Sequence, residues 1–101
     1  RDRDLVRLHW PPPRRAAFDL LLALDDRLAE VALGAREPAL GAVKLAWWRD
    51  QLAALDKGAP PAEPLLREVA ATLLPLGLRG EALSDLAEGW MRLLEEGEDP
   101  D

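Results

Sequence analysis

The sequence predicts an all-α protein, built as a bundle of four helices. Leucine and alanine, which favour helices, supply 39 of the 101 residues. Residues with β-branched side chains, which favour strands, number five, namely four valines and one threonine. Nine prolines and seven glycines divide the chain into segments of helical length. We expect residues 1–101 to form a single helical domain, with 1–13 as an extended arm and 98–101 as a frayed tail.

Proline and glycine define the first two helices. The first is predicted over residues 14–33, because a triple proline precedes it and Gly34 follows as a left-handed cap. The second is predicted over residues 38–56. Pro38 fits its first turn, where no N–H donor is needed, and a glycine follows its end.

The last two helices follow from the same signals. The third is predicted over residues 64–74, before Pro75, and the fourth over residues 81–96, before Gly97. Each helix has an apolar stripe at helical spacing, which favours antiparallel packing. The stripes are Ala17, Leu21, Leu24, Leu28 and Val31; Leu45, Trp48, Leu52 and Leu55; Leu65, Leu66, Val69, Ala70 and Leu73; and Leu83, Leu86, Trp90, Leu93 and Leu94.

The second helix is apolar beyond its stripe. Leu40, Val43 and Trp47 widen the apolar surface. If this side stays exposed, it forms a patch of a few hundred Å², the size that marks an interface. The sequence therefore predicts a homo-oligomer or a partner protein.

Missing residue types exclude several kinds of chemistry. Without cysteine there is no disulfide and no thiolate, which fits a cytoplasmic location. The only histidine, His9, and the only serine, Ser84, lie at opposite ends of the chain, and Ser84 is expected to be an ordinary first-turn helix residue. No glycine-rich phosphate loop occurs. The longest apolar run, Leu20–Leu24, is too short for a transmembrane segment.

The charge distribution argues against nucleic acid as a partner. The formal net charge is −6. Seven arginines and six acids in residues 1–36 give +1, and six cations and thirteen acids in residues 37–101 give −7. A nucleic-acid backbone requires clustered cations, which this acidic chain does not supply.

Two motifs resemble one protein family. The arm contains D-R-D-L at residues 2–5, and residues 37–52 read E-P-A-L-G-A-V-K-L-A-W-W-R-D-Q-L. Both are similar to motifs at the start of the squalene/phytoene synthase family. The resemblance covers most of this chain and the N-terminal part of a family domain. It implies the all-α isoprenoid-synthase fold and, in active members, head-to-head joining of two prenyl diphosphates.

The resemblance also implies Mg²⁺ held by two aspartate-rich motifs, which stabilises the departing diphosphate. The first motif, approximately D-D-x-x-D, aligns with residues 29–33, which here read A-E-V-A-L. The second would lie beyond Asp101. The first motif is therefore interpreted as lost, and no cofactor is expected, with Mg²⁺ required only if the chain belongs to an enzyme.

A shifted acidic cluster leaves two interpretations open. Asp25, Asp26 and Glu30 could hold Mg²⁺ in a displaced register. The interpretation we favour is that Asp19, Asp26 and Glu30 form a solvated polar face, while Asp25 lies nearer the core and pairs with an arginine.

The tryptophan motif also has two readings. Trp48 falls on the core stripe, whereas Trp47 lies about 100° away and is a candidate to line a ligand pocket or a partner groove. Arg49 is a second candidate ligand contact, although we favour a structural ion pair or a bond to a helix end for it. Trp90 and Met91 are expected in the core.

Three functions follow. The leading one is a squalene/phytoene synthase-like protein that has lost catalysis and acts as a binding or assembly module, with a prenyl or lipid-like ligand or a protein partner beside Trp47. Some family members act in this way, as assembly factors for respiratory complex I. The first alternative is a fragment or subunit of a Mg²⁺-dependent prenyl transferase. The second is a plain helical interaction domain.

Overall fold

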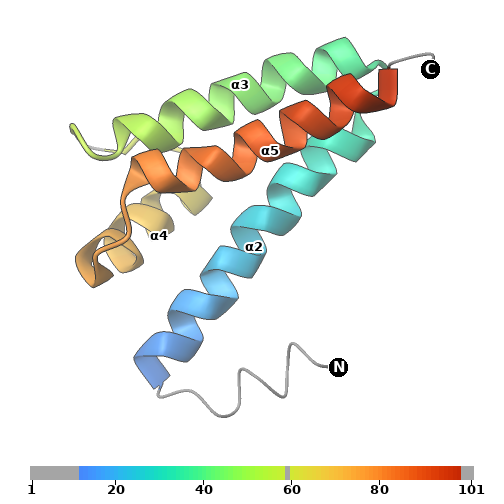
Figure 1. Ribbon diagram of the computed structural model, residues 1–101. Coiled ribbons are helices and arrows are strands. Elements are labelled where there is room, and N and C mark those ends of the chain that lie inside the picture. Colours follow the sequence, from blue (N-terminus) through green and yellow to red (C-terminus); the bar gives the residue numbers. More distant parts are fainter. Residues whose placement is uncertain (1–11, 59, 99–101) are drawn as a thin grey trace.

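The computed structural model describes residues 12–58 and 60–98, and this part of the chain is helical (Figure 1). It contains no strand, and the predicted all-α class is confirmed. The elements are α2 (Pro12–Gly34), α3 (Pro38–Ala54), α4 (Pro64–Thr72), the 3₁₀ helix η1 (Leu74–Leu76) and α5 (Gly80–Glu98).

The helix ends differ from prediction by about two residues. Helix α2 begins at Pro12, not at residue 14, because a proline in the first turn loses no hydrogen bond. Helix α3 ends at Ala54, and the chain turns before the predicted end at residue 56. The third segment changes to 3₁₀ geometry after Thr72. Helix α5 continues past the predicted stop at Gly97.

The predicted arm and tail fall mainly on residues outside the described part. Residues 1–11 of the arm and 99–101 of the tail lie there. Pro12 and Pro13, predicted as part of the arm, belong to α2, and Glu98 belongs to α5.

Local sequence fixes the start of α4 and the approach to α5. Both carboxylate oxygens of Glu63 accept the Leu65 backbone N–H, at 2.9 and 3.0 Å. Pro64 follows Glu63 as the first helical residue. Gly77, with φ 98°, ends η1 in the left-handed region that favours glycine. These turns direct the chain from α4 into α5.

Helices α3 and α5 lie antiparallel and side by side along their length (Figure 1). Glycines permit this close approach. A Cβ at Gly80 would overlap the Leu52 carbonyl oxygen, and a Cβ at Gly41 would lie 3.0 Å from Leu94 Cδ1. Helix α2 diverges from this pair toward its N-terminal end, which gives the molecule an open V shape in Figure 1.

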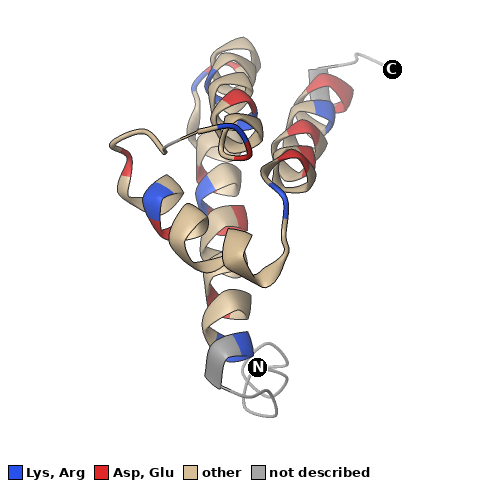
Figure 2. Ribbon diagram, turned by 90° about the vertical axis from the view of Figure 1, so that its left-hand side faces the viewer, with Lys and Arg blue, Asp and Glu red and all other residues tan. Residues whose placement is uncertain are grey.

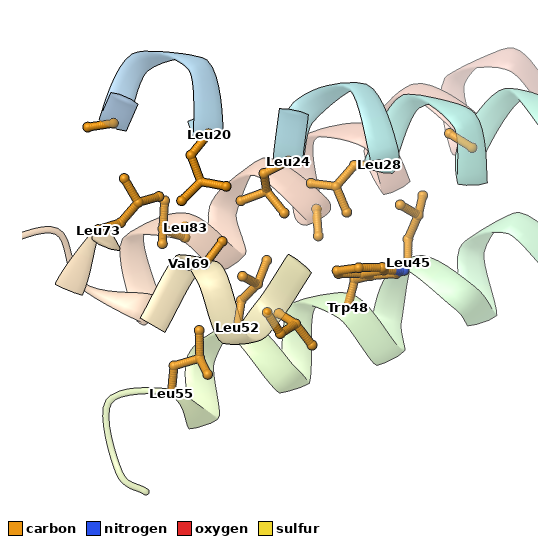
Figure 3. Close-up of a cluster of buried hydrophobic side chains, with 14 residues drawn as sticks. Leu20, Leu24, Leu28, Leu45, Trp48, Leu52, Leu55, Val69, Leu73 and Leu83 are labelled. Atoms are coloured by element: carbon orange, nitrogen blue, oxygen red, sulfur yellow. The ribbon is translucent and has the colours of Figure 1, made fainter. Parts of the chain in front are cut away.

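The core lies where the four helices meet (Figure 3). It contains side chains from all four helices, so no pair of helices forms it alone. The stripe of α3 is buried as predicted, including Trp48. The fully buried large side chains are Leu24, Leu28, Leu45, Leu52, Leu66, Val69 and Leu73.

The stripe of α5 was predicted wrongly at one position. Leu93 is 55% exposed, whereas Ala87 is buried. Leu93 lines the shallow groove that Asp25 of α2 borders, and its side chain there stays in contact with solvent. Trp90 and Met91 pack partly buried against the core, as predicted. Because α5 begins at Gly80, Ser84 is the fifth residue of the helix and not a first-turn residue as predicted; its buried hydroxyl donates to the Glu81 carbonyl oxygen at 2.6 Å.

Candidate functional site

The outer face of α3 is apolar and uncovered. Leu40, Val43 and Trp47 are 51%, 68% and 44% exposed, respectively. Spacings of three and four residues place them on one side of the helix. We call these three residues the outer face. Helix α3 is therefore apolar on two sides, one that packs in the core and one that faces solvent.

Trp47 is held in place by the core residue next to it. Its ring meets the Trp48 ring edge-on, with centroids 5.4 Å apart and planes at 88°, a favourable aromatic geometry. Trp48 is 6% exposed. The Arg27 guanidinium lies 5.8 Å from the centroid of the Trp48 ring and 3.7 Å from a Glu63 oxygen. The exposed indole thus rests on a buried one.

Arg49 lies on a different side of α3 from Trp47. Its Nε donates to Asp50 Oδ1 at 3.1 Å, and its NH1 lies 3.9 Å from Met91 Sδ on α5. This ion pair joins neighbouring residues at the surface, and a ligand-binding role of Arg49 stays a prediction. Arg49 also lines a cavity of about 190 Å³ with residues of α5. The structure does not bring Trp47 and Arg49 into one site.

Asp25 connects α2 with α5. Its Oδ1 accepts a hydrogen bond of 3.0 Å from Trp90 Nε1, where we had expected an arginine. Both residues line a shallow groove of about 280 Å³, together with Asp85, Leu86, Gly89 and Leu93. No signal in the sequence pairs Asp25 with Trp90, because 65 residues separate them.

A family model of squalene/phytoene synthase matches residues 1–98. The chain belongs to the squalene/phytoene synthase family. The match confirms the resemblance seen in the arm and the tryptophan motif, and the family's all-α fold agrees with the helices described above. Neither the curated proteins nor the solved structures gave a significant match.

The Mg²⁺ implied by membership of the squalene/phytoene synthase family requires several oxygen ligands at one place. Asp26 and Glu30 lie exposed on α2, and Asp25 is half-buried against Trp90. In residues 12–58 and 60–98, no three acidic or histidine side chains lie close enough to hold a metal ion. This arrangement does not fit the implied cluster. A metal role for Asp25, Asp26 and Glu30 stays a prediction of the enzyme alternative.

A second carboxylate interaction in this family member also escaped prediction. Asp56 Oδ1 accepts the Gly80 N–H at 2.7 Å, and Oδ2 accepts the Glu81 N–H at 3.0 Å. These two bonds, aided by the charge of Arg79, hold the pKa of Asp56 below its ordinary value, although desolvation opposes them. Asp56 caps α5 from outside the helix, and sequence spacing gives no sign of this contact.

No helix in the described part of the family member is long and apolar enough to cross a bilayer. The prediction of no transmembrane segment is confirmed for these residues.

Proposed function

We propose that this member of the squalene/phytoene synthase family is catalytically degenerate and acts as a binding or assembly module. Its docking surface is the outer face of α3. The observation that carries the proposal is the exposure of Leu40, Val43 and Trp47 on the same helix as a buried core stripe. Exposure of three adjoining apolar side chains to water is unfavourable. A bound molecule that covers them would be stabilised by the burial of this apolar surface.

The acidic residues of α2 support the loss of catalysis. A leaving diphosphate carries several negative charges and requires clustered cations or metal ions. Residues 29–33 lack the aspartate-rich motif, and Asp25 accepts a hydrogen bond from Trp90.

The cytoplasmic location stays a prediction.

The decisive assay measures turnover. The protein is incubated with farnesyl or geranylgeranyl diphosphate and Mg²⁺, and diphosphate release is followed. We expect no release above the rate without protein. Release that is lost in Asp25→Ala or Glu30→Ala, with Glu68→Ala unaffected as the control, would overturn the proposal and support the prenyl transferase alternative.

Family membership itself favours that alternative, because active members join prenyl diphosphates. The complete open reading frame discriminates between the prenyl transferase and the catalytically degenerate binding module. A downstream helix with a second aspartate-rich motif would support the enzyme, and its absence would support the binding module.

A titration separates the binding module from a plain interaction domain. Prenyl diphosphate or a prenyl alcohol is added while tryptophan emission is recorded. A lipid-like ligand on the outer face would shift the emission, and Trp47→Phe would reduce that shift. An emission that does not change would argue for protein partners alone.

A further inference from the structure

Met91 carries the single sulfur atom of these 101 residues, since the sequence contains one methionine and no cysteine. It lies in the C-terminal half of α5 and packs partly buried against the core. Peroxides oxidise a thioether to a sulfoxide, which turns a flexible apolar side chain into a polar one. Oxidation at sulfur is therefore confined to one position of the sequence, and its effect depends on the surroundings of Met91.

The Met91 sulfur faces the guanidinium group of Arg49 where α3 and α5 pack side by side. Arg49 Nη1 lies 3.9 Å from Met91 Sδ, and Arg49 Nε donates to Asp50 Oδ1 at 3.1 Å. A thioether is a weak acceptor. Figure 2 shows acidic positions repeated along α5, yet Arg49 forms a salt bridge with Asp50 alone among the residues that the structure describes. Toward the described part of α5, the guanidinium therefore donates only to this weak acceptor.

Solvent reaches this contact through the cavity that Arg49 lines. The cavity has a volume of about 190 Å³, and its other walls come from Glu88, Met91, Arg92 and Glu95 of α5. The Arg49 side chain is 33% exposed, and Met91 is half-buried. A sulfoxide adds one oxygen atom to the side chain. Because one oxygen atom is small beside this volume, the two helices need not separate to admit it.

We propose that Met91 is a site of oxidation by hydrogen peroxide and that Arg49 binds the sulfoxide formed there. A sulfur lone pair attacks one peroxide oxygen, and the O–O bond breaks. The leaving oxygen takes the hydrogen from the attacked oxygen and departs as water. Sulfur gives up two electrons, and the peroxide is reduced by two. This inference concerns the contact between α3 and α5 and does not depend on the outer face or on the loss of catalysis.

The sulfoxide oxygen is a stronger acceptor than the thioether it replaces. The Arg49 guanidinium is charged, so the hydrogen bond that it donates to this oxygen is of the stronger kind. A methionine sulfoxide usually disrupts an apolar core, whereas at this contact it gains a donor that is already in place. Two thiols reverse the step, becoming a disulfide while the sulfoxide oxygen leaves as water, and methionine sulfoxide reductases catalyse this reduction.

The first test locates the site. The folded chain is treated with dilute hydrogen peroxide, and mass spectrometry counts the oxygen atoms taken up. The wild-type chain should gain one oxygen atom, and Met91→Leu should gain none under the same conditions. A wild-type chain that gains none while folded, or equal uptake by Met91→Leu, overturns the assignment of Met91 as the site.

The second test measures what Arg49 contributes. Oxidised wild type should melt within about 2 °C of the reduced chain, because the sulfoxide finds a donor. Arg49→Leu removes every donor and keeps an apolar stem, so oxidation should lower its melting temperature by about 4 °C or more. Arg92→Leu removes the other arginine of the cavity and should respond to oxidation as the wild type does. Equal losses in wild type and Arg49→Leu overturn the proposed bond.

The third test needs no substitution of Arg49. The wild-type chain is prepared with isotope-labelled arginine, and its side-chain N–H signals are followed by NMR. The Arg49 signals should shift on oxidation, and those of Arg67, on α4, should stay in place. A methionine sulfoxide reductase with a dithiol should return the Arg49 signals to their first positions. Arg49 signals that do not respond to oxidation overturn the proposal.

Discussion

At the residue scale, Asp56 stabilises a helix to which it does not belong. It follows the C-terminal end of α3, and its carboxylate accepts the backbone N–H groups of Gly80 and Glu81. The first N–H groups of a helix have no intrahelical partner, and a negative charge near them is favourable. One side chain therefore fixes both the entry of α5 and its position against α3.

The lowered pKa of Asp56 predicts acid-sensitive stability. The pKa is about 3.8 without these bonds and lower in the folded protein. The contribution to stability is therefore complete above pH 4 to 5 and is lost as the pH falls through the folded pKa. Asp56→Ala should lower the melting temperature most at pH 7, and its effect should become smaller as the pH falls through the folded pKa of Asp56, where the carboxylate loses its charge. Glu68→Ala is the control, and an effect of Asp56→Ala that does not change with pH would contradict the prediction.

At the element scale, Gly80 and Gly89, two of the three glycines of α5, differ in their surroundings. A Cβ at Gly80 would overlap the Leu52 carbonyl oxygen of α3, whereas a Cβ at Gly89 would meet nothing within 4 Å. Close packing of α5 on α3 therefore requires the first glycine and not the second. Sequence alone shows a glycine at each of these positions and does not tell which of them the packing requires.

Alanine at each position tests this difference. Gly80→Ala should reduce the free energy of unfolding by about 1–3 kcal/mol, because the α3–α5 contact must open. Gly89→Ala should increase it by about 0.5–1 kcal/mol, because alanine restricts the unfolded chain and favours the helix. Urea denaturation measures both. Two losses of equal size would show that the close approach at Gly80 is not the cause.

At the scale of the whole molecule, the position of α2 defines the open V. Its C-terminal half packs on α3 and α5, and its N-terminal half diverges. The Asp25–Trp90 hydrogen bond is a polar connection between α2 and α5. Because one partner is a carboxylate, this bond is stronger than one between neutral groups.

A double-mutant cycle tests this connection. Asp25→Ala and Trp90→Phe should each destabilise the fold, and their effects should couple by about 1 kcal/mol, since either change removes the same bond. Asp25→Ala combined with Trp47→Phe should show no coupling. Additive effects of Asp25→Ala and Trp90→Phe in urea denaturation would contradict a stabilising bond between them.

The sequence alone determined the class of fold, the four helices and the family. Three kinds of signal carried these predictions: the alanine and leucine content, the positions of proline and glycine, and the motif at residues 37–52. All three are local properties, which do not depend on how the helices pack against each other. For the same reason the buried stripe of α3 was predicted correctly. The outer face was also visible in the sequence, as apolar residues in excess of one core stripe.

Tertiary structure decided which apolar sides are covered and which distant groups meet. Leu93, expected in the core, is exposed beside the groove that Asp25 borders, and the partners of Asp25 and Asp56 lie on α5. The sequence established that α3 has more apolar surface than one stripe, and only the packing of α2, α4 and α5 determined that Leu40, Val43 and Trp47 face solvent. The physical reason is that helical periodicity fixes which residues share a side, whereas the crossing of other helices fixes which side is buried.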